Sequence, residues 1–186
     1  MPTAFLFHGI EGNPKENWLP WLKKELTAKG YDVIIPHFPG GSEPALAQWE
    51  KVFTEYTSSI DSASIIIAHS LGCAFALRVL ENLTHPIFGT ILVAPVWGRG
   101  MGQEYEPAME NFVRDPFDWD VIKNNGGAIQ IIQSDNDRFI PLRKSSTLSH
   151  HLHCPLAIIH DAGHFNTSSG YDQFPELLEL LDGGIR

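Results

Sequence analysis

Short apolar runs recur along the whole chain, and each is followed by turn residues and then by a segment with helical spacing. Most of these runs are β-branched and continuously apolar, which is typical of strands that are buried on both faces. They span residues 4–7, 33–35, 64–68, 90–94, 129–132 and 156–159. The pattern therefore predicts a sheet of about six strands.

Amphipathic segments separate these runs. The first has apolar residues three and four positions apart and a glycine after its end, namely Trp18, Trp21, Leu22, Leu26 and Gly30. Similar patterns predict helices over about residues 43–58, 71–83, 142–152 and 171–181. Alternating strands and helices favour an α/β fold of three layers, with a mostly parallel sheet between helices on both faces. Active groups are then expected beyond the carboxyl ends of the strands.

Residues 95–120 show no clear periodicity and form too long a stretch for a bare connection. Met101 and several aromatic residues occur here among glycines and prolines: Trp97, Tyr105, Phe112, Phe117 and Trp119. Two interpretations stay open, either a partly helical insertion that packs its aromatic residues on the core, or the lining of a pocket.

Composition narrows the function classes. The 186 residues are 43% hydrophobic and 19% charged, which supports a folded core and suits one domain, residues 1–186, without a large cap. The formal net charge of −9 lacks the basic excess that nucleic-acid binding needs. Cys73 and Cys154 are too few for a disulfide framework. Without a basic leader or a long apolar run, we expect a soluble, cytoplasmic protein with no membrane partner.

The third apolar run leads directly into the turn His69-Ser70-Leu71-Gly72 and then into a helical pattern. This order matches the G-x-S-x-G nucleophile elbow, in which small residues on both sides of the serine prevent backbone clashes. Ala68 replaces the first glycine, and its methyl group is the smallest increase in size. The N–H of Leu71 at the helix start could stabilise an oxyanion. The alternative is a serine that only caps the helix.

A nucleophilic serine needs a histidine base, which a carboxylate orients. Nine histidines compete for this role. Those between a helix and the next strand belong at the opposite edge of the sheet. His8 and His37 precede Ser70, against the order Ser, Asp, His that accompanies this elbow. His69 adjoins the serine, and its side chain is expected to point away.

Two histidines and three aspartates remain near strand ends. His160 ends its strand, whereas His164 lies in a glycine-containing loop that can reach over the sheet edge, so His164 is the preferred base. Asp161 is too close in sequence to orient it. Asp137 opens an apolar run toward the next helix and is preferred as the acid over Asp135, which then caps the turn.

With these elements in order, the chain resembles the small serine hydrolases of the α/β-hydrolase superfamily, the family that includes retinoblastoma-binding protein nine and its bacterial relatives. The segments that carry this resemblance are 7–9 with 18–21, 69–72, 137–141 and 162–165. The resemblance implies Ser70 as nucleophile, Asp137 as acid and His164 as base. It also implies an α/β-hydrolase-like fold without a large cap, and hydrolysis of esters or amides.

The loop after the first strand, residues 8–13, is the expected source of a second oxyanion donor. Gly9 permits close approach of the backbone, so the N–H of Ile10 is expected to partner that of Leu71, unless the loop is simply a glycine-rich turn.

The sequence therefore predicts a serine hydrolase that cleaves a small-molecule ester or amide through an acyl-enzyme, with no cofactor and no metal. The alternative is a catalytically weak module on the same fold that binds a protein partner. Metal-dependent hydrolysis through His160, Asp161 and His164, or through the histidines of residues 150–153, is less favoured. Gly163 opposes the helix that ligands four residues apart would need. The pocket is expected to be shallow and open.

Overall fold

In the computed structural model, which describes residues 1–99 and 106–183, six parallel strands form one sheet. The strand order is β2-β1-β3-β4-β5-β6. The strands are β1 (Thr3–Phe7), β2 (Asp32–Ile34), β3 (Ile65–His69), β4 (Gly89–Val93), β5 (Ala128–Ser134) and β6 (Leu156–Ile159). Every predicted strand is present, which confirms the α/β class.

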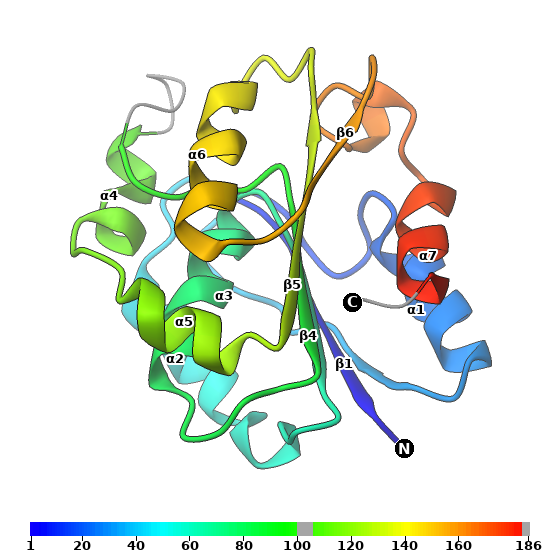
Figure 1. Ribbon diagram of the computed structural model, residues 1–186, viewed down its shortest axis with the longest axis vertical. Coiled ribbons are helices and arrows are strands. Elements are labelled where there is room, and N and C mark those ends of the chain that lie inside the picture. Colours follow the sequence, from blue (N-terminus) through cyan, green and yellow to red (C-terminus); the bar gives the residue numbers. More distant parts are fainter. Residues whose placement is uncertain (100–105, 184–186) are drawn as a thin grey trace.

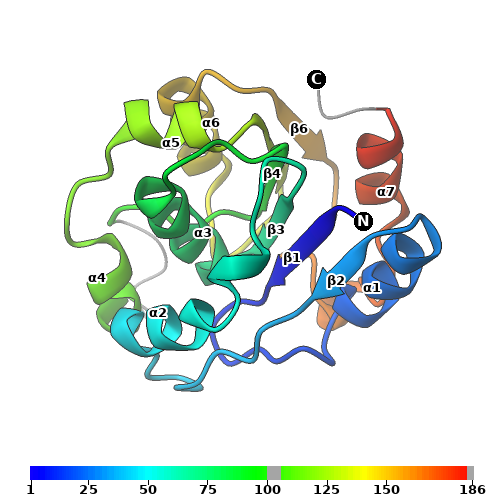
Figure 2. The ribbon, with the colours of Figure 1, turned by 90° about the horizontal axis from the view of Figure 1, so that it is seen from below.

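Helices cover both faces of this sheet (Figure 1). On one face lie α1 (Leu19–Ala28) and α7 (Pro175–Asp182). On the other lie α2 (Leu46–Thr54), α3 (Leu71–Asn82), α4 (Glu106–Val113), α5 (Trp119–Asn125) and α6 (Leu142–Leu152), as Figure 2 shows from below. The three layers predicted from the alternation of strands and helices are confirmed. No helix in the described part of the chain has the length and apolar character of a membrane span.

The two faces of the sheet belong to separate hydrophobic clusters. Phe5 and Phe7 of β1 pack with α2 and α3, whereas Ala4 and Leu6 pack with α1 and α7. This division follows from the pleat, which points successive side chains to opposite faces. Full burial on both faces holds for β1, β3 and β4. It is wrong for the edge strands β2 and β6, which leave Ile34 half-buried and Ile158 46% exposed.

The aperiodic stretch 95–120 contains α4 and the beginning of α5. Phe112 and Phe117 are buried in the larger cluster, and Trp97 packs against it, so this stretch is partly helical with its aromatic residues on the core. Met101 and Tyr105 lie outside the described residues.

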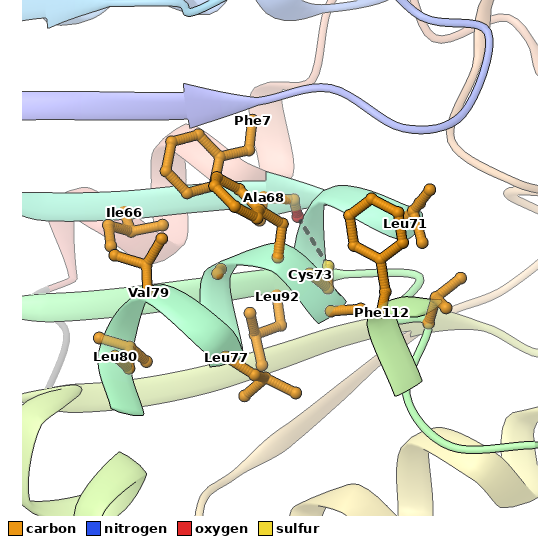
Figure 3. Packing of buried hydrophobic residues seen from close by; sticks show 14 of the residues in the cluster. Phe7, Ile66, Ala68, Leu71, Cys73, Leu77, Val79, Leu80, Leu92 and Phe112 are labelled. Atoms are coloured by element: carbon orange, nitrogen blue, oxygen red, sulfur yellow. Dashed lines mark hydrogen bonds between the residues drawn. The ribbon is translucent and has the colours of Figure 1, made fainter. Parts of the chain in front are cut away.

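Helix α3 follows the serine turn and has more buried residues than any other helix in the described part of the chain. Between Leu71 and Leu80 every side chain except that of Arg78 is buried. Figure 3 shows the close packing around Cys73, whose thiol donates a hydrogen bond to the carbonyl of Ala68 at 3.2 Å. Burial raises the pKa of Cys73 well above its ordinary value, so the thiol stays protonated and keeps the start of α3 attached to the end of β3.

Candidate active site

Ser70 lies in a strained turn between β3 and α3. Its backbone has φ 55° and ψ −121°, a combination that residues other than glycine rarely adopt. Neighbouring strands hold the turn in place. The N–H of Ser70 donates to the carbonyl of Val93 at 2.9 Å, and its carbonyl accepts from the N–H groups of Cys73 and Val96 at 3.0 and 3.2 Å. Backbone hydrogen bonds therefore hold the turn on both sides of the serine.

Two glycines leave the space that this turn requires. A Cβ atom on Gly72 would lie 2.6 Å from the carbonyl oxygen of His8, and one on Gly9 would lie 2.9 Å from the Cβ of Ser70. Both distances are too short for carbon atoms. Ala68, in contrast, is fully buried in β3, where its methyl group belongs to the larger hydrophobic cluster. The alanine thus fits an elbow whose other small position has room only for glycine.

Three of the predicted site residues form a hydrogen-bonded chain. The Oγ of Ser70 lies 3.1 Å from the Nε2 of His164, and the Nδ1 of His164 lies 2.8 Å from the Oδ2 of Asp137. The side chain of Asp137 is fully buried and that of His164 is 12% exposed. Each residue comes from a loop at the carboxyl end of a different strand, as expected for a parallel sheet.

Asp137 accepts hydrogen bonds at both carboxylate oxygens. Its Oδ1 accepts from the backbone N–H groups of Phe139 and Ile140 at 2.8 and 3.0 Å, and its Oδ2 also accepts from Gln133 at 3.2 Å. Burial by itself would raise the pKa of Asp137, but the hydrogen bond from His164 and these donors outweigh burial and hold the pKa below its ordinary value. The carboxylate is therefore ionised beside the histidine.

Asp135, the alternative acid, lies elsewhere. Its Oδ2 is 2.6 Å from the Nδ1 of His160, and its Oδ1 accepts from the backbone N–H of Asp161 at 3.0 Å. The hydrogen bond from His160 lowers the pKa of Asp135 and raises the pKa of His160 in return. The structure therefore brings Asp137, and not Asp135, to His164.

The loop that carries His164 is held by side chains from the end of β5. The hydroxyl oxygen of Ser134 accepts from the N–H of Ala162 at 3.0 Å, and the Oδ1 of Asn136 accepts from the N–H of Gly163 at 2.7 Å. Ser134 also donates its own proton to Asn136 at 2.7 Å. The motifs of the sequence do not point to these two residues, and the available signal is the run of polar residues after an apolar strand.

The two expected oxyanion donors, the N–H groups of Ile10 and Leu71, belong to the loop after β1 and to the start of α3. Leu71 begins α3, and the N–H of a first helical residue has no partner within its helix. Among the hydrogen bonds between described residues, none uses the N–H of Leu71 or of Ile10.

The loop that carries Ile10 is held by His8, whose role sequence reasoning missed. The Nδ1 of His8 donates to the carbonyl of Gly9 at 2.8 Å, and its Nε2 accepts from the N–H of Phe38 at 3.0 Å. Only the neutral ring can do both. Burial lowers the pKa of His8, which favours that neutral form. Its place directly after an apolar strand and before a glycine was the available signal.

A cavity of about 240 Å³ lies over Ser70 and His164. Its apolar wall consists of Ile10, Val96, Met109, Phe139 and Ile140. Its polar rim consists of Glu11, Glu16, Asn17 and Asn166. The stretch 95–120 contributes Val96 and Met109 to this cavity, whereas its described aromatic residues lie in the core or pack against it. Those aromatic residues therefore fit the first interpretation of the stretch.

The alternative metal clusters do not assemble. In residues 1–99 and 106–183, no group of three or more histidine, cysteine, aspartate or glutamate side chains is placed to hold a metal ion. His160 pairs with Asp135, and His151 stacks on Trp119 with ring centroids 4.8 Å apart.

A parallel sheet, a serine on a strained turn between strand and helix, and a histidine and a carboxylate on later loops together define the α/β-hydrolase class. A family model described as "Serine hydrolase" matches residues 4–183. The chain belongs to this serine hydrolase family, which confirms the resemblance inferred from its motifs, and it is an enzyme.

Relatives support the same assignment. The chain is 28% identical over 180 residues to YdeN of Bacillus subtilis, covering 96% of this chain and 93% of that protein. It is 30% identical over 165 residues to the serine hydrolase RBBP9 of Rattus norvegicus, covering 88% and 84%. The crystal structure of the B. subtilis ydeN gene product superposes with a TM-score of 0.92 at 26% identity, over 98% of each chain.

Proposed function

We propose that this enzyme hydrolyses a small ester or amide through an acyl-enzyme formed on Ser70. The observation that carries the proposal is the series of hydrogen bonds from Ser70 through His164 to Asp137. The Oγ of Ser70 lies 3.1 Å from the Nε2 of His164, whose Nδ1 lies 2.8 Å from the Oδ2 of Asp137. These are hydrogen-bonding distances for a nucleophile, its base and an orienting carboxylate.

In the proposed reaction, His164 takes the proton of Ser70 while the serine oxygen attacks the substrate carbonyl. The N–H groups of Ile10 and Leu71 stabilise the oxyanion, and Asp137 stabilises the imidazolium of His164. His164 then gives its proton to the leaving group, which departs and leaves the acyl-enzyme. In the second half, His164 accepts a proton from water, the hydroxide attacks the acyl carbon, and Ser70 is released with its proton restored.

The cavity supports a small substrate with an uncharged acyl group. Its volume of about 240 Å³ is below the roughly 300–1,000 Å³ of pockets for drug-sized ligands. Its described lining carries two glutamates, Glu11 and Glu16, and neither lysine nor arginine. Anionic esters are therefore expected to react more slowly than neutral esters of the same size.

The substitution Ser70→Ala tests this proposal. Turnover of an activated ester should fall by roughly 10³-fold or more, and labelling by a fluorophosphonate probe should disappear. The fold should persist, because the serine occupies a turn and its hydroxyl bonds only to His164 among the described residues. Circular dichroism and thermal unfolding check the fold.

The matched control is Ser62→Ala, which removes an exposed hydroxyl ahead of β3 and should change neither turnover nor labelling. Turnover by Ser70→Ala at the rate of the unchanged protein would contradict the proposal. If the wild-type protein neither turns over esters nor reacts with the probe, the result would instead favour the alternative function, a catalytically weak module that binds a protein partner.

A further inference from the structure

His69 precedes Ser70, the proposed nucleophile, in the sequence. Its ring is directed to residues 160–165, the loop that carries the proposed base His164 and is called the base loop below. Its Nε2 lies 2.8 Å from the backbone carbonyl oxygen of His164. A carbonyl only accepts, so the hydrogen of the neutral ring is on Nε2. The two imidazole rings lie with centroids 4.9 Å apart. His69 is 5% exposed and borders the cavity over Ser70.

The His69 ring is suited to a fixed, uncharged contact. Burial lowers the pKa of His69 to about 3, and the proximity of His164 contributes in the same direction. The ring therefore stays neutral at neutral pH. It adds no positive charge beside His164 when that ring becomes an imidazolium.

The base loop contains backbone strain that needs such contacts. Asp161, Gly163 and Phe165 all have positive φ, at 57°, 56° and 52°, and two of them are not glycine. Strained conformations persist only where the surroundings over-determine them. The side chains of Ser134, the last residue of β5, and of Asn136 accept from N–H groups on one side of this loop. On the other side, His69 holds the carbonyl of His164, and the Nε1 of Trp18 donates to the carbonyl of Phe165 at 3.0 Å.

We infer that His69 is a positioning residue for the reaction, because its Nε2–H fixes the backbone of His164 to the strand end that carries Ser70. The inference rests on the proposed function. Ser70 and His69 are consecutive, so a single side chain connects the nucleophile turn to the base loop. This connection sets the distance from the Oγ of Ser70 to the Nε2 of His164, and an error of about 1 Å in such a distance can cost 10²-fold in rate.

Two substitutions separate the hydrogen bond from the shape of the ring. His69→Phe keeps a ring without a donor, whereas His69→Gln places an amide N–H near the position of Nε2. The measurements are kcat and KM for an activated ester, and the rate of fluorophosphonate labelling at Ser70. His69→Phe should lower kcat and the labelling rate by roughly 10- to 100-fold with KM within about 3-fold. His69→Gln should restore most of both rates.

Trp97→Phe is the control for stability. It removes a partly buried ring N–H that donates to the carbonyl of Lys144 on α6 at 3.0 Å, outside the base loop. It should lower the melting temperature about as much as His69→Phe and keep the labelling rate within about 3-fold. If His69→Phe does not fold, His69→Asn replaces it, because its amide corresponds to Nδ1 and falls short of the carbonyl.

Equal rates in the His69→Phe and His69→Gln proteins would overturn the inference, as would loss of labelling in Trp97→Phe as large as in His69→Phe. Failure of the proposed function is distinguishable, since the unchanged protein itself would then show no labelling at Ser70.

Discussion

Asp137 accepts four hydrogen bonds, and their arrangement leaves its carboxylate no role except as an acceptor. The N–H groups of Phe139 and Ile140 occupy Oδ1, and Gln133 and His164 occupy Oδ2. An asparagine amide group in place of Oδ2 would direct hydrogens at His164. The ring would then accept at Nδ1 and carry its proton on Nε2, where it could no longer accept the proton of a nucleophile.

Asp137→Asn should therefore lower kcat for an activated ester by roughly 10²- to 10⁴-fold with little change in KM. Steady-state kinetics at neutral pH provide the measurement. Asp135→Asn is the matched control, since its amide oxygen can still accept from the N–H of Asp161, and its kcat should stay within about 3-fold. Equal losses of kcat in Asp137→Asn and Asp135→Asn would show that Asp137 is not the specific partner of His164.

Helix α3 and the loop after β1 approach each other closely at Gly72. A Cβ atom there would lie 2.6 Å from the carbonyl oxygen of His8 and 2.8 Å from that of Phe7. Both neighbours are backbone atoms, so the loop itself would have to move. The same loop carries Ile10, the proposed oxyanion donor. The distance between α3 and β1 therefore affects both stability and the geometry of the site.

Gly72→Ala should lower the free energy of unfolding by roughly 1–3 kcal/mol and reduce kcat by at least about 10-fold. Urea unfolding and ester kinetics measure the two effects. Ala68→Gly, at the other small position of the elbow, should keep kcat within about 3-fold, because removing a methyl group forces no backbone movement. The idea is wrong if Gly72→Ala leaves both quantities unchanged.

The elements and the candidate triad could be predicted because each depends on local sequence. Apolar runs mark the strands. Ser70 follows β3 directly, and Asp137 and His164 come three and five residues after the ends of β5 and β6. Partners across the fold could not be predicted in this way. His8 meets Phe38, 30 residues away, and His69 meets His164, 95 residues away, and neither contact has a periodic signal. Helix ends could not be predicted in this way either: the pattern predicts a helix over 171–181, whereas α7 begins at Pro175, whose ring suits a first turn.

Across the whole molecule, the carboxyl end of the sheet buries two neutral histidines. His8 is 2% exposed and His69 is 5% exposed, and burial is the largest cause that lowers the pKa of each. Each ring also holds a loop of the candidate site, so the geometry of that site and the acid stability of the fold depend on the same side chains.

His69 should make the folded state less stable in mild acid. An unfolded chain takes up a proton at this ring near pH 6.5, whereas the native ring does so only near pH 3. Between these values the unfolded state binds more protons, so stability present at neutral pH is lost as pH falls below 6.5. For His69 alone the loss between pH 7 and pH 5 is about 2 kcal/mol.

Urea unfolding at pH 7, 6 and 5 measures this loss, and His69→Gln is the matched comparison because glutamine does not titrate. The variant should lose about 2 kcal/mol less than the unchanged protein over this range. The hydrogen bond to Asp135 raises the pKa of His160, so the contribution of His160 to the pH dependence of stability has the opposite sign. Because His160 is present in both proteins, this contribution cancels in the difference. Parallel pH profiles for the two proteins would show that His69 is not buried in its neutral form.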